Sequence, residues 1–139
     1  MKAIILLTIF LFSGFIIQAQ QGSWKIKLNN KTLVETRTEL PQKNVRTIKA
    51  SDWKKSGKLE ILFTEDQKDI WFRTFYFTDE ADNDLLRKDS TTHLKITLTE
   101  LKKLFKGKKQ INIYTTVSPV DPSIAIRMRR VHLLTLRLP

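Results

Sequence analysis

Apolar and polar residues alternate with a period of two along most of this chain, and that alternation limits the possible folds more than any other feature of the sequence. Trp24, Ile26 and Leu28, for example, are separated by single lysines. Successive side chains of a β-strand point to opposite faces, so this pattern predicts a strand with one buried face. Similar segments cover 58–64, 92–98 and 110–117. The chain therefore predicts an all-β fold.

Further segments complete the predicted set of strands. They are 32–38, 45–50, 70–77, 85–88 and 124–138. Residues 70–77 are apolar on both faces apart from Arg73 and Thr74, which is typical of a central strand, and with 58–64 they predict a hairpin across an acidic turn. In the last segment the alternation inverts near Arg130 and His132. This inversion predicts a bulge or a bend within a long final strand or strand pair.

The period changes to that of a helix after Thr97. Thr97 and Glu100 have the spacing of a capping box, and the apolar residues at 98, 101 and 105 form the stripe of one helix face. Residues 51–57 predict one helical turn or a tight loop. The prediction is a single antiparallel β-sandwich, immunoglobulin-like or cupredoxin-like in architecture, with one short helix near 98–106. A β-barrel is the main alternative.

The first residues have the order of a secretory signal. Lys2 precedes an apolar run from Ala3 to Ile17, and small or polar residues follow it. This order predicts a signal peptide over 1–19 and a β-sandwich domain over 20–139. The alternative is an uncleaved anchor, although the run is shorter than the roughly 20 apolar residues of a spanning helix. We expect an exported protein of the periplasm, cell surface or extracellular medium, with no membrane span after cleavage.

The residues that support metal or redox chemistry are scarce. The chain has no cysteine, which excludes thiol enzymes and the copper centre of cupredoxins. His93 and His132 are the only histidines; we predict no metal site, the alternative being a copper or zinc site with Met128. The acidic turn 79–84 lacks the glycine and the final glutamate of an EF-hand, so we predict a solvated loop there rather than a calcium site. We predict no catalytic residue and no cofactor.

Basic residues concentrate in the last third of the chain. The whole chain has a net charge of +11, and residues 101–139 contribute +8 of it because Asp121 is their only acid. Such a surface attracts polyanions, with a solvated charged face as the alternative. The predicted contact residues are Lys102, Lys103, Lys106, Lys108, Lys109, Arg127, Arg129 and Arg130. Trp53 lies in a charged segment and is the predicted exposed aromatic residue, whereas Trp24 and Trp71 are predicted to be core.

Three segments of the chain carry a resemblance to a group of known proteins. Residues 49–57, 86–93 and 127–133 resemble small exported β-sandwich proteins of Bacteroidota. The resemblance covers most of the predicted domain. It implies export and supplies no catalytic residue.

These observations favour a non-enzymatic binding or interaction module outside the cytoplasm. Its partner would be an anionic glycan, lipopolysaccharide or a protein, contacted through the basic face. One alternative is a structural component of a cell-surface or periplasmic assembly that pairs through an edge strand such as 32–38. Another is a hydrolase of acidic glycans that uses the acids of 79–89.

Overall fold

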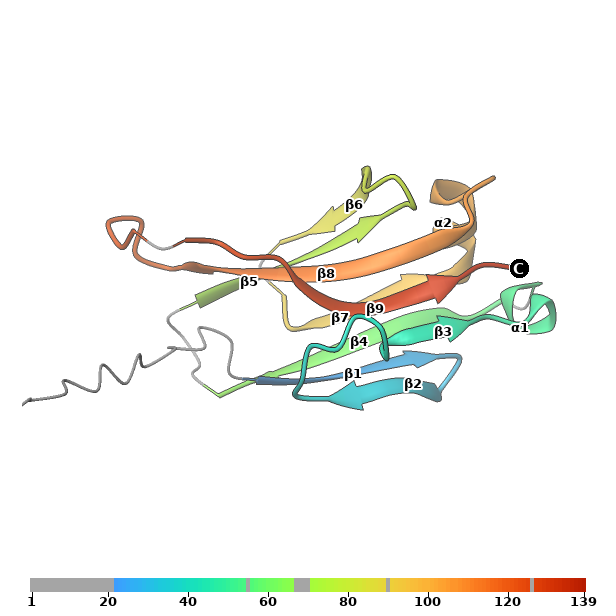
Figure 1. Ribbon diagram of the computed structural model, residues 1–139, viewed down its shortest axis with the longest axis horizontal. Coiled ribbons are helices and arrows are strands. Elements are labelled where there is room, and N and C mark those ends of the chain that lie inside the picture. The colour runs from blue at the N-terminus through green and yellow to red at the C-terminus, as the bar shows by residue number, and fades with distance from the viewer. Residues whose placement is uncertain (1–21, 55, 67–70, 90, 126) are drawn as a thin grey trace, which may run out of the picture.

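Two β-sheets make up the structure, a computed structural model that describes residues 22–139 except 55, 67–70, 90 and 126 (Figure 1). The four-stranded sheet has the strand order β2 (Lys31–Thr36), β1 (Gly22–Leu28), β4 (Lys58–Glu65), β7 (His93–Thr97). The five-stranded sheet has the order β3 (Val45–Thr47), β9 (Val131–Arg137), β8 (Gln110–Pro119), β5 (Trp71–Thr78), β6 (Asp84–Lys88). The predicted signal peptide, residues 1–19, lies outside the described residues.

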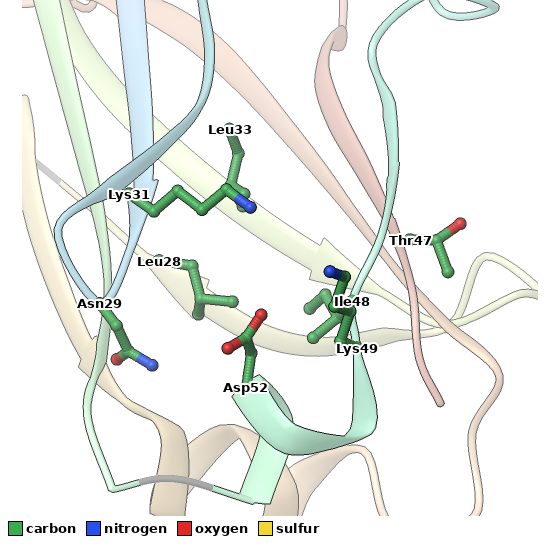
Figure 2. Close-up of a pocket in the computed structure, with 8 residues that line it drawn as sticks. All are labelled: Leu28, Asn29, Lys31, Leu33, Thr47, Ile48, Lys49 and Asp52. Atoms are coloured by element: carbon green, nitrogen blue, oxygen red, sulfur yellow. The ribbon is translucent and has the colours of Figure 1, made fainter.

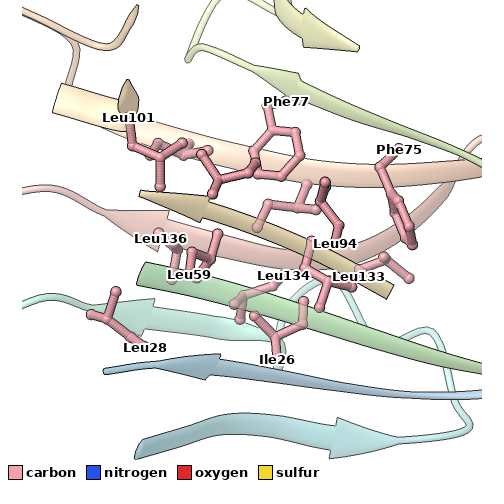
Figure 3. Close-up of a cluster of buried hydrophobic side chains, with 14 of the residues drawn as sticks. Ile26, Leu28, Leu59, Phe75, Phe77, Leu94, Leu101, Leu133, Leu134 and Leu136 are labelled. Atoms are coloured by element: carbon pink, nitrogen blue, oxygen red, sulfur yellow. The ribbon is translucent and has the colours of Figure 1, made fainter. Parts of the chain in front are cut away.

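The two sheets pack face to face around one apolar core (Figure 3). Ile26 of the four-stranded sheet and Phe77 and Leu134 of the five-stranded sheet are fully buried. Burial of such side chains is the main favourable term in folding. The predicted all-β sandwich is confirmed. Every described core residue lies between Trp24 and Leu136, so a chain that starts at residue 20 keeps this core.

Neighbouring strands of the described residues are antiparallel with one exception. β3 runs parallel to β9, with Val45 opposite Thr135. The chain reaches β3 after leaving β2 in the other sheet, and Arg46 joins the two edges, because its Nε donates to the carbonyl oxygen of Leu33 at 2.8 Å. β5 lies between β8 and β6, which confirms its predicted central position.

The predicted hairpin between 58–64 and 70–77 is wrong. β4 pairs with β1 and β7, whereas β5 pairs with β8 and β6 in the other sheet. Alternation predicts which face of a strand is buried but does not predict its neighbours. A partly buried ion pair joins the two strands across the sheets. The Arg73 guanidinium donates to the Glu65 carboxylate at 2.9 Å and lies 3.5 Å from the centre of the Phe63 ring.

The final strand is shorter than the predicted segment 124–138. β9 covers only Val131–Arg137. Ile124 and Met128 continue the apolar alternation in the sequence, but both side chains are exposed. Residue 126 lies outside the described residues. The apolar residues before β9 therefore belong to a surface rather than to a core-facing strand.

The predicted irregularity in the last segment is a β-bulge. Ile113 of β8 lies opposite Leu134, and the next residue, Tyr114, lies opposite His132. Leu133 is the extra residue between them. Leu133 and Leu134 are both fully buried, so the bulge turns two consecutive side chains into the core.

The predicted helix is present as α2 (Leu98–Leu104). Thr97 is its N-cap, and the Thr97 hydroxyl oxygen accepts a hydrogen bond from the N–H of Glu100 at 3.1 Å. Leu98 and Leu101 are buried against the sandwich. In the turn after the helix Gly107 has a φ of 76°, a conformation that favours glycine.

The molecule has two distinct ends (Figure 1). One end carries the β1–β2 turn, α2, the end of β9 and α1 (Ala50–Lys54), which occupies the region predicted as a helical turn or tight loop. Residues 120–125 project beyond β8 at the opposite end. β8 has 10 residues, so at about 3.3 Å per residue the two ends are about 30 Å apart.

Candidate binding surfaces

The predicted lysines lie together on α2 and on the turn that follows it. They are Lys102, Lys103, Lys106, Lys108 and Lys109. Lys103, Lys106 and Lys109 are exposed, and their side chains form no ion pair with another described residue. Lys102 is half-buried and already has an interaction partner. The structure thus leaves three lysines of this group available to a ligand.

Lys108 has a structural role in the same turn. Its ammonium group donates to the Asp79 carboxylate at 2.6 Å, and that carboxylate also accepts from the side chain of Asn83 and from the N–H of Ala81. The Asp79 side chain is only 1% exposed. These hydrogen bonds, of which the bond from Lys108 has the largest effect, hold the pKa of Asp79 well below its ordinary value. The bond between Lys108 and Asp79 also raises the pKa of Lys108. The ion pair therefore anchors the turn that carries the exposed lysines.

Four more cations lie at the same end, and sequence analysis does not single them out. They are Lys31, Lys49, Lys54 and Arg137, all exposed. The parallel pairing of β3 with β9 sets Thr47 opposite Arg137, and the N–H of Leu138 bonds to the carbonyl oxygen of Lys109 at 2.8 Å. Only the strand order brings these residues together, so no local pattern signals them. We call Lys31, Lys49, Lys54, Lys103, Lys106, Lys109 and Arg137 the basic end.

A cavity of about 180 Å³ opens at the basic end (Figure 2). Its walls come from β1, β2, β3 and α1, and Leu28, Leu33 and Ile48 supply its apolar surface. Lys31 and Lys49 line the same cavity, as does the already engaged Asp52. The cavity therefore offers an apolar wall beside two cations.

The wall of this cavity depends on a close approach at Gly57. Asn29 lines the cavity with a φ of 49°, and its side-chain oxygen accepts a hydrogen bond from the N–H of Lys58 at 3.1 Å. A Cβ atom on Gly57 would lie 1.7 Å from that oxygen. Glycine at position 57 therefore permits the Asn29 contact.

The predicted arginines do not join the lysines. Arg127, Arg129 and Arg130 directly precede β9, whereas the lysines lie on α2 and on the turn before β8. Arg129 forms an ion pair with Glu39, and Arg130 forms one with Asp84 at 2.8 Å. Arg127 is exposed and has no ion pair among the described residues. The eight predicted contact residues are thus divided between two surfaces.

Exposed apolar side chains gather at the projecting end. They are Phe72 (45% exposed), Val120 (46%), Ile124 (51%) and Met128 (60%), which we call the apolar tip. Phe72 lies opposite Ser118 in the pairing of β5 with β8, and the Ser118 hydroxyl contacts the Met128 sulfur at 3.1 Å. Leu40 is the one other large apolar residue exposed in the described part of the chain. The exposed apolar surface is therefore concentrated rather than scattered.

The acids of 79–89 are bound by the chain itself. The Glu80 carboxylate accepts from the N–H of Lys109 at 3.2 Å, and the Asp89 carboxylate accepts from Arg87 at 2.9 Å. The pKa of Asp89 is lowered, chiefly by the bond from Arg87, and the pKa of Glu80 is lowered, chiefly by its own backbone N–H. A glycosidase needs a general acid with a raised pKa. The pKa values of Glu80 and Asp89 are shifted in the opposite direction.

The two histidines belong to different sheets. His93 on β7 lies 2.7 Å from the Glu60 carboxylate, and His132 on β9 lies 2.8 Å from the Thr135 hydroxyl. Burial lowers the pKa of His132, and its Nδ1 atom is buried without a hydrogen-bond partner in the described residues. No cluster of three His, Asp or Glu residues suited to a metal ion occurs in the part of the chain that the structure describes.

The tryptophans differ from their predictions at two positions. Trp24 is buried as predicted, and its indole N–H donates to the carbonyl oxygen of Leu133 at 3.3 Å. Trp53 is half-buried rather than exposed, because α1 packs it against the end of the core. Trp71 at the start of β5 is half-buried and lies outside the core cluster.

A scan against protein-family models and searches of curated proteins and of solved structures found no match to this chain. Within the described ranges, no helix has the length and apolar character needed to cross a membrane.

Proposed function

We propose that this protein is an exported, non-enzymatic binding module that contacts polyanions through the basic end. One observation carries the proposal: seven exposed cations lie at one end of the sandwich, and none forms an ion pair with another described residue. A cation that is already paired must give up its partner before it binds a ligand. The cations of the basic end have no such partner to give up among the residues that the structure describes.

Several cations on one rigid surface suit a ligand that carries repeated negative charges. Each cation near an anionic surface contributes about 1 kcal/mol, so a few contacts together give a specific preference for polyanions over single anions. Such binding releases counterions, and the affinity therefore falls as the salt concentration rises. Outside the cytosol the ligands with this chemistry are acidic glycans and the phosphorylated part of lipopolysaccharide.

The proposal is tested by measuring how tightly the chain that starts at residue 20 binds heparin. The affinity is measured by titration calorimetry at about 50 and about 200 mM salt. We expect the unaltered protein to bind and its affinity to fall at the higher salt concentration. Changing Lys106 and Lys109 to Glu is expected to weaken binding at least about tenfold, because two favourable contacts of about 1 kcal/mol each are lost.

The matched control is K43E/R127E. Lys43 and Arg127 are exposed, have no ion pair among the described residues and lie outside the basic end. This control makes the same change in net charge as K106E/K109E, so a general electrostatic effect weakens both variants equally. Equal weakening, or heparin affinity that does not depend on salt, would contradict the proposal.

A second candidate function follows from the edge of the four-stranded sheet. β2 is an edge strand, and an exposed edge can pair with a strand of another protein in an assembly. Arg46 already occupies the carbonyl oxygen of Leu33 on this edge, so a partner strand must displace it. Sedimentation velocity distinguishes this function: Arg46→Ala is expected to increase self-association if β2 is an assembly edge, and to leave a monomer if it is not.

A further inference from the structure

The apolar tip is a second surface that polyanion binding does not explain. Its four side chains are 45–60% exposed, and they come from β5 and from the 120–128 segment, which are far apart in the sequence. Single exposed apolar residues are common on proteins, whereas a contiguous group of them marks an interaction site. The tip is therefore a candidate site for a ligand with apolar character.

One exposed cation without an ion pair lies beside the tip. Arg127 is exposed and forms no ion pair among the described residues, whereas Arg129 is paired with Glu39. Asp121 is the only acid of 119–130. The Asp121 carboxylate accepts hydrogen bonds from the N–H and the hydroxyl of Ser123, at 2.9 and 2.7 Å. The one negative charge is therefore partly satisfied within the loop, and the ligand meets an apolar centre with Arg127 at its margin.

At four positions of this loop no backbone N–H group needs water. Pro119 and Pro122 have no N–H group. The N–H of Ser123 bonds to the side chain of Asp121, and the N–H of Ile124 bonds to the Asp121 carbonyl oxygen at 3.2 Å. An unsatisfied N–H opposes entry into hydrocarbon. These four positions carry no unsatisfied backbone donor.

We propose that the apolar tip inserts into the interface of a lipid bilayer that carries anionic headgroups. Val120, Ile124 and Met128 occupy the boundary between headgroups and acyl chains, and Arg127 lies among the headgroups. The projecting shape of this end (Figure 1) suits contact with a broad, soft surface. The basic end, about 30 Å away along the strands, stays accessible to a polyanion while the tip is inserted.

The test is co-sedimentation of the chain that starts at residue 20 with phosphatidylcholine vesicles, prepared with and without phosphatidylglycerol. We expect stronger binding to the anionic vesicles. I124N/M128Q is expected to lower the partition coefficient about tenfold or more, because it removes several buried methylene groups from the interface. Arg127→Gln is expected to weaken binding to the anionic vesicles and to leave binding to neutral vesicles unchanged.

The matched control is Leu40→Gln, because Leu40 is an exposed apolar residue (38%) outside the tip. Unchanged partition of I124N/M128Q, or an equal loss in Leu40→Gln, overturns the proposal. A dimer that forms without lipid and disappears in I124N/M128Q, with no binding to either vesicle, overturns it in favour of a protein contact. Since I124N/M128Q keeps the basic end, its heparin affinity is expected to stay unchanged. The heparin measurement therefore distinguishes a failure of the lipid proposal from a failure of the polyanion proposal.

Discussion

The two ends of the sandwich carry cations in opposite circumstances. At the basic end Lys103, Lys106 and Lys109 are exposed and form no ion pair among the described residues. In the segment before β9, Arg129 is bound to Glu39, and Arg130 lies over the Tyr76 ring and is bound to Asp82 and Asp84. The apolar side chains show the reverse distribution, buried at the basic end apart from its cavity and exposed at the tip.

This difference shows that net charge alone does not define a binding surface. Residues 101–139 supply cations to both ends, yet within the described part of the chain only one end presents a set of them without carboxylate partners. The carboxylate partners of each cation decide which surface suits a polyanion. Near the projecting end, where carboxylates bind most of the arginines, the exposed apolar side chains are the more distinctive feature of the surface.

The ends also differ in the burial of the ion pair that anchors each of them. The pair between Arg73 and Glu65 on the projecting side has side-chain exposures of 2% and 15%. The pair between Lys108 and Asp79 at the basic end has exposures of 34% and 1%. A charge that loses its partner in the interior is destabilised far more than one that water can reach. Substitutions at the two ion pairs therefore test whether burial determines how much each pair contributes to stability.

The largest expected effect is that of Arg73→Met. It leaves the Glu65 carboxylate partly buried without its partner and is expected to reduce the free energy of unfolding by about 3–5 kcal/mol, measured by urea denaturation. The control is Arg37→Met, which breaks an exposed pair with Asp66 and is expected to change stability by about 0–1 kcal/mol. Equal losses in the two variants would show that burial does not distinguish these pairs.

A smaller, pH-dependent effect is expected for Asp79→Asn at the basic end. The pKa of Asp79 is lowered in the folded protein, so its stabilising contribution is complete above the unfolded value near 4 and is lost as the pH falls toward the folded value. The difference in Tm between the unaltered protein and the variant should be largest near neutral pH and shrink below about pH 4. A difference that stays constant from about pH 7 to about pH 2 would contradict the assigned ion pair.

The smallest effect is expected at the N-cap of α2, which helps to orient the lysines. Thr97→Ala removes the acceptor for the N–H of Glu100 and is expected to lower stability by about 1 kcal/mol, measured by thermal unfolding. Thr99→Ala, on the exposed surface of the same helix, is the control and should be nearly neutral. If both changes have the same effect, the capping interaction does not stabilise this helix.

The sequence predicts the position of individual strands better than it predicts which strands pair with each other in a sheet. The alternation around Ile61 and the apolar run around Phe75 mark β4 and β5, but the two strands lie in different sheets. Hydrophobic pattern records burial, whereas strand order depends on contacts between distant segments. For the same reason Lys31, Lys49 and Arg137 cannot be assigned to the basic end from the sequence, since the placement of β2 and the pairing of β3 with β9 bring them there.

The apolar tip shows where the same pattern misleads. Ile124 and Met128 keep the parity of the core-facing residues of β9, and they therefore predict a longer strand. Both side chains are exposed, because β9 begins only at Val131. Apolar alternation is thus compatible with a core strand and with an exposed loop, and burial in the folded protein is needed to separate them.

The division of the molecule into two binding surfaces is tested most directly by measuring both ligands on the same three proteins. Heparin affinity and partition to anionic vesicles would be compared for the unaltered chain, K106E/K109E and I124N/M128Q. We predict that K106E/K109E loses heparin affinity with the larger part of its vesicle binding retained, and that I124N/M128Q loses vesicle binding with its heparin affinity unchanged. If either variant loses both ligands to the same extent, the two ends are not separate binding surfaces.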